Sequence, residues 1–179
     1  MNIFFRQLIE NDCPKLHTWY LEPIIKKFYA NDDYYSLEDI KKKYLPRIQG
    51  IDKTFCYIVT LDEDPIGFIQ YYALCDHLPS GVTSHKNKLF EISKPENLAG
   101  IDMFIAEVSS RGKGFGHQIL DQFAKECIAP LFDGLVVDPS VNNRQAIKCF
   151  EKCGFYIAPF SETDQNIIMI KKLSNKECK

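Results

Sequence analysis

The fold prediction starts from the hexapeptide Arg111-Gly112-Lys113-Gly114-Phe115-Gly116. It follows an apolar run, residues 99–105, that predicts a strand, and it precedes residues 117–128, whose apolar side chains recur at helical spacing. A glycine-rich turn between a strand and a helix leaves the first N–H groups of the helix without partners, and the helix dipole adds positive potential. Such a turn can bind a pyrophosphate, because a glycine has no Cβ to keep the phosphate from the main chain. A turn that binds nothing fits the hexapeptide equally well.

Two common phosphate motifs do not fit this turn. A Walker A loop requires Gly-Lys-Ser/Thr, which is absent, and a dinucleotide fingerprint counted from Gly112 would place its last glycine at His117.

Working outward, apolar periodicity and turn residues predict elements along the whole chain. We predict strands over residues 3–8, 54–61, 66–74, 99–105, 134–137, 155–158 and 166–171. Helices are predicted after Asn11 or Asp12, from residues 36–39, over 117–128, and from Asn142 or Asn143 through residue 152, where Gly154 ends the last one.

The connections between these elements complete the fold prediction. Glu22-Pro23 interrupts the first helix, and residues 62–65 form the turn of a hairpin. Residues 75–98 are polar and weakly periodic, which predicts a long functional or mobile loop. The order β, α, α, β, β, β, α, β, α, β, β predicts one α/β (α+β) domain over residues 1–179, with helices packed on a largely antiparallel sheet.

Composition excludes several classes of protein. The chain has 179 residues, 45% of them apolar and 26% charged, which is typical of a soluble globular domain. A net charge of -2 without a basic patch argues against nucleic acid or a membrane surface as a partner. We predict a cytoplasmic location, because the N-terminus has no signal-peptide pattern and no run approaches the roughly 20 apolar residues of a membrane span.

The seven cysteines predict no metal site. No CxxC pair occurs, and Cys75-Asp76-His77 with His85 matches the spacing of no common site. Cys149 and Cys153 share one helix face and are predicted to pack as small apolar side chains.

A second motif gives the chain a family resemblance. Residues 138–155, DPSVNNRQAIKCFEKCGF, are similar to the last signature of the GNAT acetyltransferase superfamily, and Arg111-x-x-Gly114-x-Gly116 resembles its acetyl-CoA loop. Two motifs in this order on successive βα units are far more specific than either alone. Within the superfamily the chain resembles, over residues 2–172, the aminoglycoside 6'-N-acetyltransferases. Some of these enzymes confer antibiotic resistance. The matching stretches are residues 44–46, 65–70, 100–102, 112–116 and 138–140.

The resemblance implies a twisted sheet whose central strands, residues 99–105 and 134–137, splay apart to admit acetyl-CoA. It implies coenzyme contacts from the following residues: Met103, Phe104, Ile105, Arg111, Gly112, Lys113, Gly114, Phe115, Gly116 and Asn143. It also matches Asp102 to the carboxylate beside the acceptor amine and Asp138 to a second carboxylate that holds the aminoglycoside. No metal is implied, and the partners are acetyl-CoA and a small amine, with the chain a monomer or weak homodimer.

The chemistry of the residues agrees with these roles. A protonated amine cannot attack a thioester, and Asp102 can hold the ammonium and accept its proton directly or through water. Because an ordinary aspartate has a pKa of about 4, we expect it to act more as a cation holder than as a strong base. A backbone N–H near Met103 or Phe104 can stabilise the developing oxyanion. Structural alternatives remain: Asp102 as a solvated strand end, and Asp138 as a capping turn before Pro139.

One position departs from the superfamily pattern. Phe150 stands where many members carry a tyrosine that protonates the leaving thiolate. Solvent or another hydroxyl, such as that of Tyr156, can take this role, because a thiol with a pKa of about 8.5 leaves readily. Two further functions stay open: a siderophore- or polyamine-type N-acyltransferase, and a non-catalytic acyl-CoA-binding module.

Overall fold

The structure, a computed structural model, describes residues 2–173. The strands within these residues are β1 (Ile3–Gln7), β2 (Phe55–Leu61), β3 (Asp64–Ala73), β4 (Leu98–Ile105), β5 (Gly134–Val137), β6 (Tyr156–Ala158) and β7 (Ile168–Lys172). The α-helices are α1 (Cys13–Tyr20), α2 (Pro23–Phe28), α3 (Leu37–Ile48), α4 (Leu89–Ile92), α5 (Phe115–Phe123) and α6 (Arg144–Lys152). Every predicted strand is present, with ends that differ by at most two residues.

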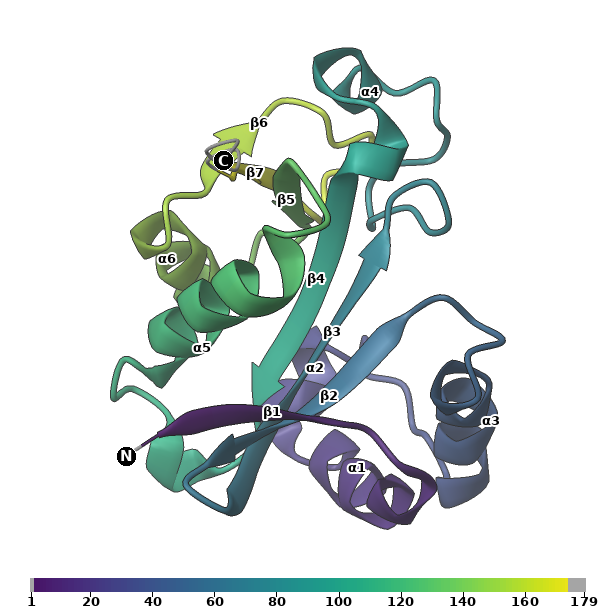
Figure 1. The fold of residues 1–179 in the computed structure, drawn as a ribbon, viewed down its shortest axis with the longest axis vertical. Coiled ribbons are helices and arrows are strands. Elements are labelled where there is room, and N and C mark those ends of the chain that lie inside the picture. Colours follow the sequence, from purple (N-terminus) through teal and green to yellow (C-terminus); the bar gives the residue numbers. More distant parts are fainter. Residues whose placement is uncertain (1, 174–179) are drawn as a thin grey trace. The chain divides into compact units, whose positions relative to one another are not determined.

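The strands form a mixed sheet in the order β1-β2-β3-β4-β5-β7-β6. The chain divides into two compact units, one of residues 2–70 and 103–113, the other of residues 71–102 and 114–173, so β3 and β4 each contribute residues to both (Figure 1). The α/β class with a largely antiparallel sheet is confirmed, while the single domain over residues 1–179 stays a prediction. None of the helices in residues 2–173 has the length and hydrophobicity needed to cross a membrane.

The first unit is built around aromatic side chains between its helices and strands. β1 and β2 pair antiparallel, from Ile3 opposite Leu61 to Gln7 opposite Tyr57. The predicted capping box begins α3, because Ser36 Oγ accepts from the Asp39 N–H at 3.2 Å and Asp39 returns a bond to the Ser36 N–H. The core contains these fully buried or nearly buried residues: Leu16, Trp19, Tyr20, Ile40, Tyr44, Ile58, Phe68 and Phe104.

The second unit contains the parallel pair β4–β5 and the antiparallel pairs β5–β7 and β7–β6. β5 is buried throughout, as expected for a short continuous apolar strand in the middle of a sheet. Helices α5 and α6 lie side by side in this unit (Figure 1). Its core includes Tyr72, Leu74, Leu89, Leu98, Val136, Ile168 and Ile170.

Three features contain more structure than the sequence analysis predicted. Pro23 does not only interrupt a helix: it is the first residue of α2, where its fixed φ suits a helix start, and Glu22 accepts from the Ile24 N–H at 3.2 Å. The connection after β3 contains α4 and a short 3₁₀ helix, Pro95–Asn97. The helix predicted from residue 117 begins at Phe115, and its last turn, Ala124–Ile128, is a π-helix.

Candidate active site

The glycine-rich turn before α5 takes its shape from two left-handed residues. Gly112 has φ 73° and Gly114 has φ 84°, a region that costs other residues energy through a Cβ clash. No heavy atom lies within 4 Å of a Cβ built on either glycine. These glycines are therefore required by backbone conformation, and a Cβ at either would project into open space.

The start of α5 offers unpartnered backbone donors to an anion. Gly114 is the N-cap residue and has no side chain to cap with, and the Gln118 N–H reaches Gly114 O at a long 3.4 Å. Gly116 is the second residue of α5, so it belongs to the helix and not to the turn. Residues 112–114 are exposed. An uncapped, accessible helix start with the positive end of the dipole fits a pyrophosphate.

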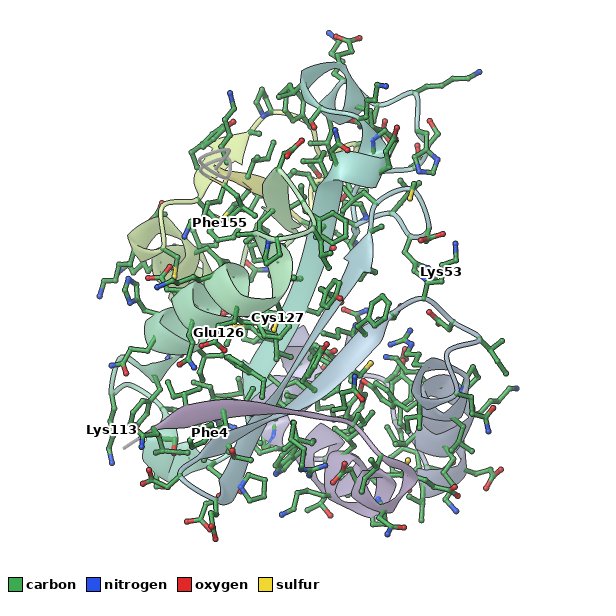
Figure 2. The ribbon with its side chains drawn as sticks, viewed as in Figure 1. Phe4, Lys53, Lys113, Glu126, Cys127 and Phe155 are labelled. Atoms are coloured by element: carbon green, nitrogen blue, oxygen red, sulfur yellow. The ribbon has the colours of Figure 1, made fainter. Side chains whose placement is uncertain are left out.

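Arg111 has its guanidinium bound within the first unit. Its Nε donates to Ile105 O at 2.8 Å, and its Nη2 donates to Ala106 O at 2.8 Å and to Glu22 Oε2 at 3.0 Å. The ion pair lowers the pKa of Glu22. These bonds hold the end of β4 to the segment that leads into the turn. Lys113, in contrast, extends its side chain away from the protein (Figure 2).

The three residues predicted to pair with the pantetheine arm form the end of β4. Phe104 is buried and stacks on Phe68 with ring centroids 5.5 Å apart, so its side chain belongs to the core. Met103 and Ile105 are half-buried. The pairing of β4 with β5 covers only Leu98 to Gly100, which leaves the later residues of β4 without partners in β5. An extended ligand can pair with such a strand segment as an added strand.

Asp102 and Asp138 lie beyond the last residues that pair between β4 and β5. Both are half-buried. Burial, and after it the nearby negative charge of Asp102, together raise the pKa of the Asp138 carboxyl to about 6. Two carboxylates that share one site in this way attract a cation.

Two segments that are distant in sequence hold the carboxylate and the main chain at Asp138. The Ser80 N–H donates to Asp138 Oδ2, and Asn166 Nδ2 donates to Asp138 O at 2.8 Å. The Ile167 N–H donates to Pro139 O at 3.1 Å. Asp138 is therefore held by contacts from distant parts of the chain, beyond its predicted capping role.

The connection before β4 is fastened to the β6–β7 connection by Glu162. This carboxylate accepts from the Thr83 N–H at 2.7 Å and from Asn87 Nδ2 at 2.8 Å, and the Gly81 carbonyl accepts from the Glu162 N–H at 2.7 Å. The sequence analysis missed Ser80 and Glu162, because their partners lie 58 or more residues away and neither belongs to a motif.

Asn143 begins α6. Its Oδ1 accepts from the Ala146 N–H at 3.2 Å, which is the predicted capping bond. With Oδ1 engaged, the Nδ2 group is the part of this side chain that can donate to a ligand.

The structure also places the residues considered for proton transfer to the leaving thiolate. Phe150 is buried and packs on Phe155, and Tyr156 is exposed on β6 at the sheet edge. The register sets Tyr156 opposite Ile170, and Ile170 opposite Val136. Because Val136 pairs with Gly100, three strand spacings of about 4.8 Å each separate Tyr156 from β4. Tyr156 is thus roughly 14 Å from that strand.

The predicted site residues fall into two groups. The second unit holds Asp102, Asp138, Gly114, Phe115, Gly116 and Asn143, and the first unit holds Met103, Phe104, Ile105, Arg111, Gly112 and Lys113. Within the second unit the structure brings together Asp102 and Asp138. Tyr71 and Tyr72, near the end of β3, are buried and pack in the core.

The sequence model of the acetyltransferase (GNAT) domain matches residues 8–162, and the chain therefore belongs to this family of acyltransferases. Among its relatives is the aminoglycoside N(6')-acetyltransferase type 1 of Klebsiella pneumoniae, 28% identical over 156 residues, which are 86% of this chain and 74% of that protein.

Solved structures agree with this assignment. The aminoglycoside acetyltransferase AAC(6')-Ib in complex with coenzyme A superposes with a TM-score of 0.77 and 26% identity, covering 96% of this chain and 95% of that one. A structure of AAC(6')-Ib with ribostamycin and coenzyme A gives a TM-score of 0.78 and 25% identity, covering 96% of this chain and 94% of that one.

Proposed function

We propose that this chain transfers the acetyl group of acetyl-CoA to the 6'-amine of an aminoglycoside. The observation that carries the proposal is the pair of carboxylates, Asp102 and Asp138, placed where the β4–β5 ladder has ended. The names of the relatives, which act on aminoglycosides at this position, support the choice of acceptor.

Acetyl-CoA supplies the activated thioester, and the main chain supplies most of its binding. The N–H groups at the start of α5 suit its pyrophosphate, and Lys113 extends from the same turn. The backbone of Met103, Phe104 and Ile105 can pair with the pantetheine arm, because β5 does not pair with that part of β4. Arg111 contributes by fixing the main chain of the turn, since its guanidinium is already bound.

Asp102 acts on the acceptor amine. Its carboxylate holds the ammonium group and takes a proton from it, directly or through one water, so that the neutral amine can attack. The rate gain comes mainly from holding the amine and the thioester carbonyl about 3 Å apart. Loss of the negative charge at this position would remove both the hold on the cation and the proton acceptor.

Asp138 adds a second anchor for a cationic acceptor. With a pKa of about 6, its carboxyl is ionised at neutral pH despite burial and the Asp102 charge. A bound polycation stabilises the ionised form of both aspartates, so acceptor binding relieves their mutual repulsion. This coupling favours an acceptor with several amino groups over one with a single charge.

The leaving thiolate takes its proton from solvent in this proposal. Phe150 has no proton to give, and Tyr156 lies about three strand spacings from β4. A thiolate with a pKa of about 8.5 needs no strong general acid at neutral pH.

We also propose that the chain acts in the cytoplasm as one domain, a monomer or weak homodimer without nucleic acid or membrane partners. Its near-neutral charge and the absence of a membrane-spanning helix in residues 2–173 are consistent with this.

Free thiol release from acetyl-CoA tests the proposed function. We expect release with an aminoglycoside that carries a 6'-amine and none with the matched compound that has a 6'-hydroxyl. Polyamines, hydroxylamines and peptide amines serve as the competing acceptor classes. Faster turnover of any of these would assign another acceptor, and tight coenzyme binding without turnover of any amine would make the chain a binding module.

A further inference from the structure

Two packed helices bring together metal-ligand side chains that the proposed reaction does not use. His117 and Asp121 lie one turn apart on α5, and Cys153 follows the last residue of α6. One donor atom from each of these three side chains lies within 4.8 Å of the other two. The closest pair, His117 Nε2 and Asp121 Oδ2, is 3.2 Å apart.

These distances suit a tetrahedral ion. Bond lengths of about 2.0–2.1 Å to nitrogen and oxygen and about 2.3 Å to sulfur give donor separations of roughly 3.3–3.8 Å. The His117–Asp121 pair is already at this separation, and Cys153 Sγ needs to move by about 1 Å at most. Both α5 side chains are 42% exposed, which gives them room to adjust and an ion a path of entry.

Cys149 is a further donor next to Cys153, outside the group of three whose donor atoms all lie within 4.8 Å of one another. Cys149 lies one helical turn before Cys153, close enough that each thiol shifts the pKa of the other. The Cys153 S–H donates to His117 O at 4.0 Å, toward α5. Cys149 is half-buried and Cys153 is buried, so the two thiols close the inner side of the cluster. The set is then two sulfurs, one imidazole and one carboxylate, which is the donor chemistry of zinc.

Lys171 completes the surroundings of the cluster. Its Nζ donates to Asp121 Oδ1 at 3.1 Å, which leaves Oδ2 as the oxygen that faces His117. A ligating carboxylate is commonly held by such an outer hydrogen bond. The lysine charge also offsets the excess negative charge of two thiolates and a carboxylate around a divalent ion.

We propose that His117, Asp121, Cys149 and Cys153 form a zinc site that joins α5 to α6. The sequence analysis predicted no metal site because it found no motif with metal-ligand spacing. The two pairs of ligands, 117/121 and 149/153, lie on separate helices that only the fold brings together. With four protein ligands the site is structural, since no coordination position is left for a substrate. It fixes the helix that starts at the glycine-rich turn to the helix that starts at Asn143.

Cobalt and zinc titrations of the reduced, untagged full chain test the proposal. We expect one Co²⁺ per chain with a thiolate-to-cobalt charge-transfer band and the intense visible bands of a tetrahedral ion, and displacement of Co²⁺ by Zn²⁺. Cys149→Ser and Asp121→Asn should each weaken zinc binding about tenfold or more, and Zn²⁺ should raise the thermal midpoint of the wild type but of neither variant.

Cys127→Ser provides the matched control. Cys127, labelled in Figure 2, is a half-buried thiol on the turn that continues α5. It does not belong to the cluster, so its substitution should change zinc affinity less than about twofold. Asp121→Asn is the variant that disturbs packing less, because this side chain is 42% exposed whereas Cys153 is buried. Absence of the charge-transfer band, or its full retention in Cys149→Ser, would overturn the proposal. A second outcome would also overturn it: the isolated chain contains a Cys149–Cys153 disulfide and, after reduction, binds neither Co²⁺ nor Zn²⁺.

Discussion

Asp102, on β4, and Asp138, directly after β5, occupy equivalent positions, each two residues beyond the last pair of the parallel β4–β5 ladder, Gly100 opposite Val136. The negative charge of Asp102 adds to the effect of burial and raises the pKa of Asp138 to about 6. The two carboxylates are thus coupled where the strands cease to pair, and this coupling can be measured.

The pH dependence of stability should report the raised pKa of Asp138. Between about pH 4 and pH 6 the folded protein holds this proton while the unfolded chain releases it, so the folded state binds more protons. The contribution of this group to the free energy of unfolding is therefore lost as the pH rises through that window. The loss is on the order of 1–3 kcal/mol. Denaturant unfolding at several pH values should show this loss in the wild type relative to Asp138→Asn.

The comparison with Asp138→Asn removes the contributions of carboxyl groups elsewhere in the chain, which titrate in the same pH range. Asp12 and Glu22 have lowered pKa values and contribute stability that is lost as the pH falls. Their contributions are common to both proteins and cancel in the difference. A difference that stays constant from pH 4 to pH 7 would contradict the assigned pKa.

Removal of the Asp102 charge should lower the pKa of Asp138 without returning it to the ordinary value. Burial is the larger cause of the shift and persists in Asp102→Asn, whereas the repulsion between carboxylates disappears. Carboxyl-carbon NMR titration of both proteins measures the change. An unchanged Asp138 titration would show that the two side chains do not interact in solution.

Asp102→Asn should also separate coenzyme binding from turnover. The amide cannot accept a proton from the amine, so we expect turnover to fall about tenfold or more. Coenzyme affinity, measured by calorimetry, should stay near that of the wild type because the main-chain contacts are unchanged. Wild-type turnover in this variant would remove Asp102 from the proposed mechanism.

Much of this fold could be predicted because its elements carry local signals. Ser36 and Asp39 form the capping box that their spacing predicts, and Gly154 adopts the left-handed conformation, φ 84°, expected after α6. The interruption at Pro23 was predicted, but the helix that begins there was not, because a proline that ends one helix can also occupy the first turn of the next.

The parts that could not be predicted depend on contacts between distant residues. Nothing near Arg111 in the sequence indicates that its guanidinium binds Glu22 and two carbonyl groups, so the motif alone suggested a coenzyme contact. Similarly, Glu162 fastens the connection before β4, although its partners Thr83 and Asn87 are over 70 residues away. Family motifs identify the backbone of the site, and tertiary contacts decide what each side chain does.

Arg111→Ala should destabilise the protein. The variant removes a donor from the carbonyls of Ile105 and Ala106 and leaves Glu22 without its partner, which we expect to cost about 1–3 kcal/mol. Glu22→Gln removes the ion pair but keeps both carbonyl bonds, so its effect on the denaturant midpoint should be smaller. Full stability of Arg111→Ala together with weakened coenzyme binding would mean that the guanidinium serves the phosphates instead.

Gly114→Ala should weaken coenzyme binding through the backbone of the turn. With φ at 84° and open space around a Cβ, the alanine side chain meets no neighbour, but the left-handed conformation costs it about 1–2 kcal/mol. Gly50→Ala is the matched control, because Gly50 has φ 72°, equally open surroundings and a place after α3, in another part of the sequence. Both variants should lose similar stability, whereas only Gly114→Ala should reduce coenzyme affinity, by about tenfold or more, because the added methyl group and the altered turn disturb the N–H groups at the start of α5. Equal coenzyme affinity in the two variants would show that this turn does not hold the pyrophosphate.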